Sequence, residues 1–233
     1  MSLLNQNLRS QDFRGSAEQM RQKMANKRQR GFSIVELLIV VIIVFILLSI
    51  AVPSIMSITR SFRIGGDTRS ISAQINLARM RAAADFTHAR VRVDLNANTF
   101  RVEEWNKASG CWQADGGSTD CPQTTSPVTP LAQGDGFGFG SISAGPTAAT
   151  STIAQAPVCK VGDATGPGAG ANIANTACIE FNSRGYPVDS TNAIVASDAI
   201  YLTNNSNRYS AIAVSIAGQT TAYSYSGSSW AGL

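Results

Sequence analysis

The residue that most clearly suggests chemistry in this sequence is Glu36, a single carboxylate placed just inside an apolar stretch. Residues 37–52 are apolar apart from Ser49, and Gly31 and Phe32 precede the carboxylate behind a basic flank. A charged carboxylate in hydrocarbon costs about 2.5 to 3.5 kcal/mol on insertion scales, so such residues usually have a function. The attraction between this carboxylate and a positive partner roughly 4 Å away would be about 4 kcal/mol at an effective dielectric constant near 20. The alternative is that Glu36 lies at the headgroup boundary and is simply solvated.

Residues 28–36 resemble the type IV prepilin signature. They read Arg-Gln-Arg-Gly-Phe-Ser-Ile-Val-Glu and continue directly into the apolar stretch. The resemblance implies that a membrane-embedded prepilin peptidase cuts the bond between Gly31 and Phe32 and methylates the new amine of Phe32. It also implies that this amine, in the same chain or on a neighbouring subunit, pairs with Glu36 during filament assembly.

The basic character of the chain is concentrated in residues 1–31, the segment that such a cut would remove. This leader holds seven of the nineteen Lys and Arg residues but only two of the fifteen Asp and Glu residues, so the remaining side chains sum to about −1. A positive flank before an apolar span stays in the cytoplasm, which predicts a periplasmic head. A secretory signal peptide is the alternative, but its apolar run is only about 7 to 15 residues long and ends in small residues, which 51–53 do not supply.

Two helical segments should follow the leader. Residues 32–53 are long and apolar enough for a transmembrane and assembly helix, and Pro53 predicts a kink or a melted stretch at its end. Residues 54–88 repeat apolar side chains at helical spacing, as an amphipathic stalk does. The apolar positions of that stalk are Ile55, Ile58, Phe62, Ile64, Ile71, Ile75, Ala78 and Ala82.

Residues 89–233 predict one exported, β-rich head. Alternating apolar residues indicate a hairpin over 91–105, with a turn at 96–98, and strands are also expected at 136–143, 177–182, 199–203, 209–216 and 220–225. Residues 106–177 are rich in Gly, Ser, Thr, Pro and Ala, which predicts a loop-rich insertion. The order of a helical stalk and then an antiparallel sheet is similar to the GspH/FimT branch of pilin-like proteins, as are the segments 75–84, 179–185 and 212–218.

Four cysteines lie in the predicted head, which favours disulfides in an oxidising compartment over a metal site, since no pair has close zinc-ligand spacing. Three pairings are possible, and proximity in the sequence favours Cys111–Cys121 and Cys159–Cys178. Each bridge would close a loop with little apolar content. No cofactor or metal is expected.

Other candidate features have simpler structural explanations. His88, the only histidine, could act as a base or pH switch, but we expect it to meet the negative end of a helix dipole. The alternating glycines at 134–140 resemble a phosphate-binding loop, but the strand before and the helix after that such a loop requires are not indicated by the sequence. Seven arginines between 60 and 92 are interspersed with acids, so we expect them to form a solvated stalk face or subunit contacts.

The resemblance implies an α+β chain with the type IV pilin fold, in which a long N-terminal helix packs on an antiparallel sheet. The implied function is that of a non-enzymatic minor pilin or pseudopilin of a type IV pilus or a type II secretion system. Its expected partners are prepilin peptidase, other subunits, inner-membrane assembly proteins and membrane lipid. The expected location is the bacterial inner membrane and then the filament. A DNA-uptake receptor and a membrane-anchored enzyme are the alternatives. DNA binding is disfavoured because residues 219–230 contain no Lys or Arg.

Overall fold

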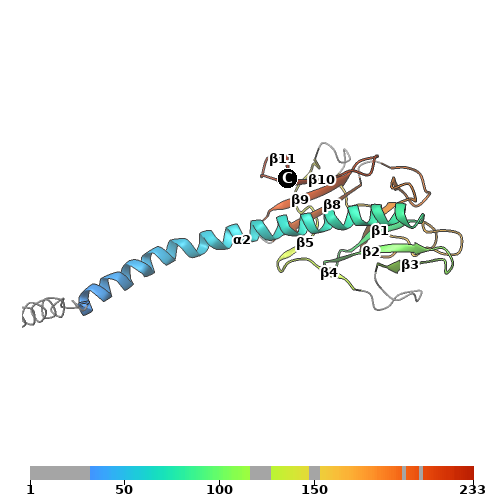
Figure 1. The fold of residues 1–233 in the computed structure, drawn as a ribbon. Helices are drawn as coiled ribbons and strands as arrows, with labels where there is room; N and C mark the ends of the chain where they lie inside the picture. Colours follow the sequence, from blue (N-terminus) through green and yellow to red (C-terminus); the bar gives the residue numbers. More distant parts are fainter. Residues whose placement is uncertain (1–31, 116–126, 147–152, 196–197, 205–206) are drawn as a thin grey trace, which may run out of the picture. The chain divides into compact units, whose positions relative to one another are not determined.

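The computed structural model describes residues 32–115, 127–146, 153–195, 198–204 and 207–233. The chain forms two compact units, Met1–Pro53 and Ser54–Leu233. In the first unit, the described residues from Ile34 onward form the beginning of helix α2 (Ile34–Ala84). The second unit contains the rest of that helix and all the described strands (Figure 1).

Helix α2 is continuous through Pro53, so the predicted melted stretch at this point is wrong. A proline removes one backbone hydrogen bond, and the turns on either side can continue the helix with a bend. The kink at Pro53 stays a prediction. The helix also ends earlier than expected, at Ala84, because Phe86 takes a left-handed φ of 49° and the amide of Thr87 donates back to the carbonyl of Ala82 over 3.2 Å.

The apolar face predicted for residues 54–88 divides into two parts. Ile55, Ile58 and Phe62 are exposed, with 61%, 51% and 76% of their surface accessible. From Ile64 onward the predicted face is buried, and it packs against both sheets. The buried positions on this face are Ile64, Ile71, Ile75, Ala78 and Ala82.

The strands form two antiparallel sheets, whereas one sheet was expected. The first has the order β3-β2-β1-β6-β7, with β4 also paired to β2, and the second has the order β11-β10-β9-β8-β5. The first sheet comprises β1 (Ala89–Asp94), β2 (Thr99–Asn106), β3 (Cys111–Ala114), β4 (Thr129–Pro130), β6 (Thr176–Phe181) and β7 (Pro187–Val188). The second comprises β5 (Asp135–Phe137), β8 (Asp198–Asn204), β9 (Tyr209–Val214), β10 (Thr220–Tyr225) and β11 (Trp230–Gly232).

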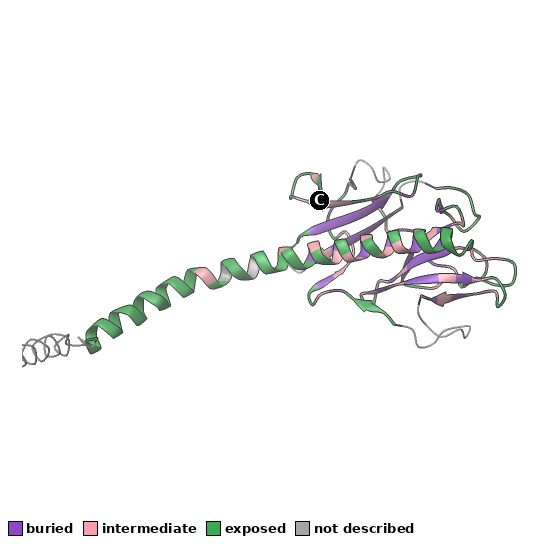
Figure 2. Ribbon diagram, in the orientation of Figure 1, coloured by how far each residue is buried: buried purple, intermediate pink, exposed green. Residues whose placement is uncertain are grey.

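The main core lies between the helical part of the second unit and the two sheets, and Figure 2 shows the buried residues on the strands of both sheets. Alternate residues of each strand supply it, because successive side chains point to opposite faces. The strand residues at its centre include Val91, Val93, Ile179, Phe181, Ile200, Leu202 and Ile212. A smaller cluster of Ala199, Tyr201, Ala211 and Ala213 packs with Phe139, Ile153, Tyr223 and Trp230. The α+β fold class is therefore confirmed, and it fits the type IV pilin fold.

An acid pair joins the helix to the start of β5. Asp67 accepts a hydrogen bond from the amide of Ala132 over 2.9 Å, and Arg63 reaches the carbonyl of Gln133 over 3.4 Å. Asp135 is buried beside Asp67. Burial, together with the hydrogen bond and the charge of Asp67, raises the pKa of Asp135 from its ordinary 3.8 to about 7.

This pair predicts a pH dependence of stability. The folded chain keeps a proton on Asp135 that the unfolded chain releases, so the free energy of unfolding should be highest below about pH 4 and fall as the pH rises to about 7. Asp135→Asn, which stays neutral, should remove this contribution. Thermal melting of the full chain in detergent micelles from about pH 4 to 8 measures the slope. The exposed-site variant Arg208→Gln, which removes no acid, should keep the wild-type slope, and an unchanged slope in Asp135→Asn would contradict the assignment.

Candidate functional site

The predicted processing and assembly residues lie at the start of α2. Gly31 is outside the described residues, and Phe32 and Ser33 precede the helix. The carbonyl of Ser33 accepts a hydrogen bond from the amide of Leu37 over 3.0 Å, which makes Ser33 the N-cap. Glu36 therefore lies in the first turn of the helix. Within the described part of the chain, the Glu36 side chain has no hydrogen bond or ion pair.

The position of Glu36 also has a local explanation that the sequence interpretation missed. Ser33 and Glu36 have the Ser-x-x-Glu spacing of a capping box, and a carboxylate in the first helical turn is favoured by the helix dipole by about 0.3 to 1 kcal/mol. Both roles are compatible, but they differ in their need for charge. A capping residue at this position can be Glu or Gln, whereas pairing with an ammonium group requires the carboxylate.

The helix that follows Glu36 has the properties of a membrane span. Residues Ile34–Val52 have a mean hydropathy of 3.3, and none of them is buried against the rest of the chain. A span of hydrocarbon requires about 20 apolar residues. The exposed apolar surface therefore fits either lipid or neighbouring apolar helices.

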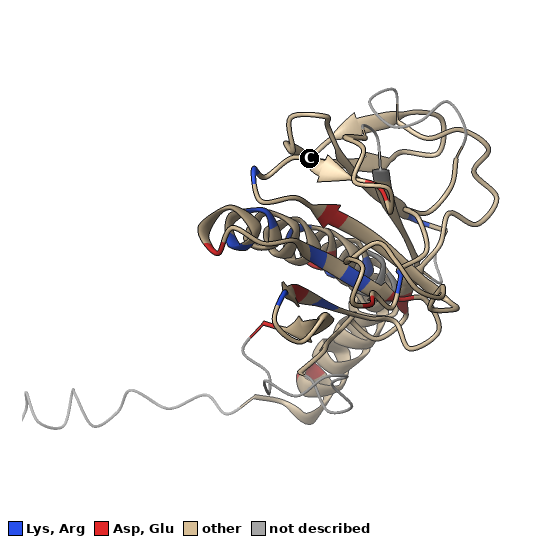
Figure 3. Ribbon diagram, turned by 90° about the vertical axis from the view of Figure 1, so that its right-hand side faces the viewer, with Lys and Arg blue, Asp and Glu red and all other residues tan. Residues whose placement is uncertain are grey.

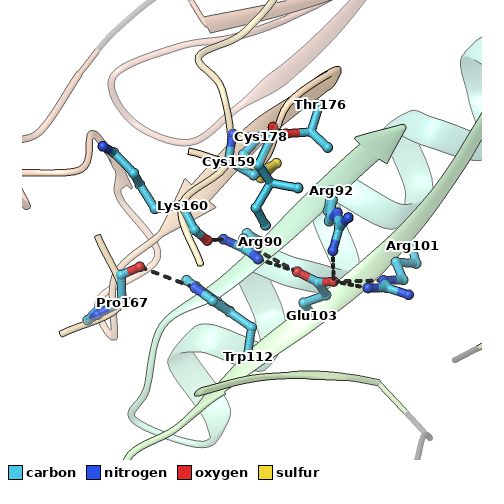
Figure 4. A network of polar contacts seen from close by, with 11 residues as sticks. Arg90, Arg92, Arg101, Glu103, Trp112, Cys159, Lys160, Pro167, Thr176 and Cys178 are labelled. Atoms are coloured by element: carbon cyan, nitrogen blue, oxygen red, sulfur yellow. Dashed lines mark hydrogen bonds and ion pairs between the residues drawn. A yellow bond between two sulfur atoms is a disulfide. The ribbon is translucent and has the colours of Figure 1, made fainter. Parts of the chain in front are cut away.

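A second polar site lies in the unit Ser54–Leu233, on the face of β1 and β2 that points away from α2. The register places Arg90 opposite Glu103 and Arg92 opposite Arg101. Alternation on the pleated sheet brings these four side chains onto one face. Figure 4 shows Arg90, Arg92 and Arg101 converging on Glu103.

Glu103 is saturated by this network. Arg90 donates to its Oε2 from Nε over 2.7 Å and from Nη2 over 2.6 Å, while Arg101 donates to Oε1 over 2.7 and 2.6 Å. Arg92 reaches Oε1 only at 3.5 Å. Burial alone would raise the pKa of Glu103, but Arg90, Arg101 and Arg92 together hold it below its ordinary value. The carboxylate is therefore ionised.

Arg90 also fastens part of the predicted insertion to the sheet. Its side chain is stacked over Trp112, 4.0 Å from the ring centroid, and its Nη1 donates to the carbonyl of Lys160 over 2.7 Å. Trp112 donates in turn to the carbonyl of Pro167 over 3.2 Å. Gly162 lies so close to Trp105 that an added Cβ would come within 2.3 Å of the ring. The described part of 153–177 is therefore packed on the sheet.

The cysteine pairing agrees with the prediction where it is described. Cys159 and Cys178 form a disulfide with their Cα atoms 5.1 Å apart, and this bridge ties the segment before Lys160 to β6. Cys111 is also disulfide-bonded. Its predicted partner, Cys121, lies outside the described residues.

Arg90 provides a test of this network. Arg90→Gln should lower the free energy of unfolding by about 3 to 5 kcal/mol, the usual cost of breaking a buried ion pair. Arg90 is only 1% exposed, so solvent does little to screen the pair. Thermal melting of the full chain in micelles measures the loss, with the exposed-site variant Arg208→Gln as a matched control. A loss below about 1 kcal/mol would show that Arg101 and Arg92 suffice for Glu103.

His88 has a carboxylate partner that the sequence did not indicate. Its Nδ1 lies 2.8 Å from Oε1 of Glu180, a residue 92 positions away, so this contact and not the helix dipole alone orients the ring. His88 and Glu180 line a polar hollow of ≈ 320 Å³ walled by the loops around Pro167 and Ser190. In the described part of the chain, no group of three or more His, Cys, Asp or Glu side chains could hold a metal ion.

Several arginines between 60 and 92 contact their own chain. Arg79 donates to the carbonyl of Gly185 over 3.1 Å, and Arg81 pairs with Glu104 and Asp115 at 3.5 and 3.1 Å. Figure 3 shows acidic residues among the basic ones. These contacts agree with structural roles for the arginines.

The aromatic residues near the C-terminus pack against each other. The rings of Tyr225 and Trp230 are 5.3 Å apart, and the indole of Trp230 donates to the carbonyl of Ala144 over 2.8 Å. Gly136, one of the alternating glycines, lies in β5, and Gly140 approaches Tyr209 so closely that a Cβ would come within 2.7 Å. These contacts give the aromatic residues and these two glycines structural roles in the described part of the chain.

Comparison with known proteins places the strongest similarity at the N-terminus. Residues 26–52 match the model of the family described as "Prokaryotic N-terminal methylation motif", a range that includes Gly31, Phe32 and Glu36. The N-terminus is therefore prepilin-like. No curated protein matches the chain.

Two solved structures are similar, both of the minor pseudopilin EpsH from the Type 2 Secretion System of Vibrio cholerae. The first has 11% identity and a TM-score of 0.41 and covers 70% of this chain and 97% of that chain. The second has 13% identity and a TM-score of 0.35 and covers 67% of this chain and 89% of that chain.

Proposed function

We propose that this prepilin-like chain is a non-enzymatic structural subunit of a filament, a minor pilin or pseudopilin of a type IV pilus or a type II secretion pseudopilus. The observation that carries the proposal is the methylation motif over residues 26–52, combined with a carboxylate in the first turn of an exposed apolar helix. The capping box accounts for the position of Glu36, but it does not account for the methylation motif or for the exposed apolar helix.

Maturation would proceed in two steps at one position. Prepilin peptidase would cut between Gly31 and Phe32 and then methylate the new amine. Removal of residues 1–31 takes away the basic leader, and the remaining chain starts with a positive group four residues before Glu36. The residues around this amine are apolar, so its charge strongly favours a nearby carboxylate.

Assembly would replace lipid with neighbouring subunits. No residue of the span Ile34–Val52 is buried, and Ile55, Ile58 and Phe62 beyond Pro53 are exposed as well. Packing of this surface against other helices keeps it away from water after the subunit leaves the membrane. An ion pair between Glu36 and the methylated amine of a neighbour would then fix the axial register.

Cell fractionation tests the proposal. The chain should be present in the membrane and in sheared or crosslinked filaments of the source bacterium, and deletion of prepilin peptidase should confine it to the membrane. The subunit that forms most of the filament serves as the positive control. Absence from filaments in peptidase-positive cells, or recovery as a soluble periplasmic protein, would contradict the proposal.

A further inference from the structure

Two arginines lie side by side on the outer face of the first sheet without a matching pair of acids. Arg92 of β1 is directly opposite Arg101 of β2. Like charges in directly opposite positions on a sheet destabilise it. Both side chains remain partly accessible, at 24% for Arg92 and 18% for Arg101. The short contacts to Glu103 give Arg101 a structural role, whereas Arg92, with only a 3.5 Å contact, adds little to the stability of the sheet.

The arginines of this cluster compete for one central carboxylate. Arg90, Arg92 and Arg101 surround one carboxylate, Glu103, whose oxygens are already occupied by the short contacts from Arg90 and Arg101. Among the described residues, Arg92 makes only the 3.5 Å contact to Glu103.

Two further acids lie near this group, and each has its own contacts. The Oδ1 atom of Asp94 accepts hydrogen bonds from the backbone amides of Asn96 and Ala97 over 3.0 and 2.8 Å. Glu180 is opposite Arg90 on the β6 side and contacts His88. The guanidinium group of Arg92 is therefore the least satisfied cation of the cluster.

These two arginines face a hollow of suitable size. The hollow has a volume of ≈ 320 Å³, and its walls combine Arg90, Arg92, Arg101 and the already paired Glu103 with the apolar surfaces of Trp112, Val161 and Ile173. Arg92 and Arg101 also border a smaller adjoining hollow of ≈ 50 Å³. Planar guanidinium groups bind carboxylates through two parallel hydrogen bonds, and such charge-assisted bonds are roughly twice as strong as neutral ones.

We propose that Arg92 and Arg101 form a binding site for the side-chain carboxylate of an acidic residue on a partner protein. The apolar walls fit the methylene groups of such a side chain, whereas a free inorganic anion would lose water against them without compensation. The volume accommodates a side chain together with part of its backbone. The inference goes beyond the proposed function, and its test depends on neither cleavage nor filament assembly.

Titration of the full chain in neutral detergent micelles tests the site. The probe is the peptide N-acetyl-Ala-Glu-Ala-amide, followed by calorimetry and by the Nε–H resonances of the arginines. We expect saturable binding that Arg92→Gln weakens about tenfold or more. The exposed-site variant Arg208→Gln should bind as the wild type does, and the matching peptide with Gln in place of Glu should not bind.

The melting temperature separates binding from a structural role. Because Arg92→Gln removes both the repulsion from Arg101 and the 3.5 Å contact to Glu103, two effects of opposite sign, its melting temperature should stay close to that of the wild type. Arg92→Lys keeps the charge without the planar fork and should bind more weakly than the wild type, which gives a second variant if Arg92→Gln does not fold. Equal binding of the Glu and Gln peptides, no effect of either variant, or saturable binding of inorganic phosphate or free glutarate without the peptide would overturn the proposal.

Discussion

Replacing Gly31 with alanine is expected to leave the chain uncut, so that the membrane fraction contains a longer protein that still carries residues 1–31. Glycine allows the closest approach of a backbone to an enzyme, and a Cβ at this position would displace the scissile bond. A displacement of about 1 Å can slow a reaction by about a hundredfold. Immunoblotting of cells that express prepilin peptidase measures the fraction cleaved.

Gly15→Ala is the matched control for this prediction. It makes the same substitution within the leader but away from the predicted cut, and cleavage should proceed as in the wild type. Efficient cleavage of Gly31→Ala with the wild-type mature mass would contradict the proposed role of Gly31.

Glu36→Ala is expected to be cleaved normally and to assemble poorly. The variant loses an attraction of roughly 4 kcal/mol between the carboxylate and the amine of Phe32, and each 1.4 kcal/mol is a factor of ten in an equilibrium constant. The association constant of the subunit with its neighbours should therefore fall by roughly several hundredfold. The ratio of filament-bound to membrane-bound protein, determined by quantitative immunoblotting, measures the effect.

Two further substitutions separate the roles that the structure allows for Glu36. Gln preserves the Ser33–Glu36 capping spacing but has no charge, whereas Asp keeps the charge on a shorter side chain. Charge pairing predicts that Glu36→Gln assembles as poorly as Glu36→Ala and that Glu36→Asp assembles better than both. Wild-type assembly of Glu36→Gln would show that helix capping is the role that matters.

The regular parts of the fold could be predicted from local patterns. The alternating residues of 91–105 predicted the β1–β2 hairpin, and β-branched and aromatic residues predicted β6, β8, β9 and β10 to within two residues at each end. For β5, three residues formed a strand where eight were expected. Four strands, β3, β4, β7 and β11, were missed because they are two to four residues long and lie in polar or glycine-rich stretches.

The division into two sheets could not be predicted. Alternation shows that a strand has a buried face, but it does not show which sheet the strand joins. The same limit applies to His88, whose partner Glu180 is 92 residues away and has no local signal. The continuous helix at Pro53 was missed because the effect of a proline depends on whether the turns around it can still pair.

The network around Glu103 depends on a register that the predicted turn did not give. The turn spans 95–98 and places Arg90 opposite Glu103 and Arg92 opposite Arg101, whereas a turn at 96–98 would shift this pairing by one residue. The burial of Arg90 by the segment around Lys160 could not be predicted, because it depends on a contact between residues 70 positions apart. The proposed carboxylate site rests on this tertiary arrangement.

The central claim is that the chain is matured as a prepilin and uses its new N-terminus for assembly. Mass spectrometry of the protein extracted from the membrane of peptidase-positive cells tests this claim most directly. We expect a chain that begins at Phe32 and carries one methyl group on its amine. A chain that keeps Met1, or one that begins after Ala51, would contradict it.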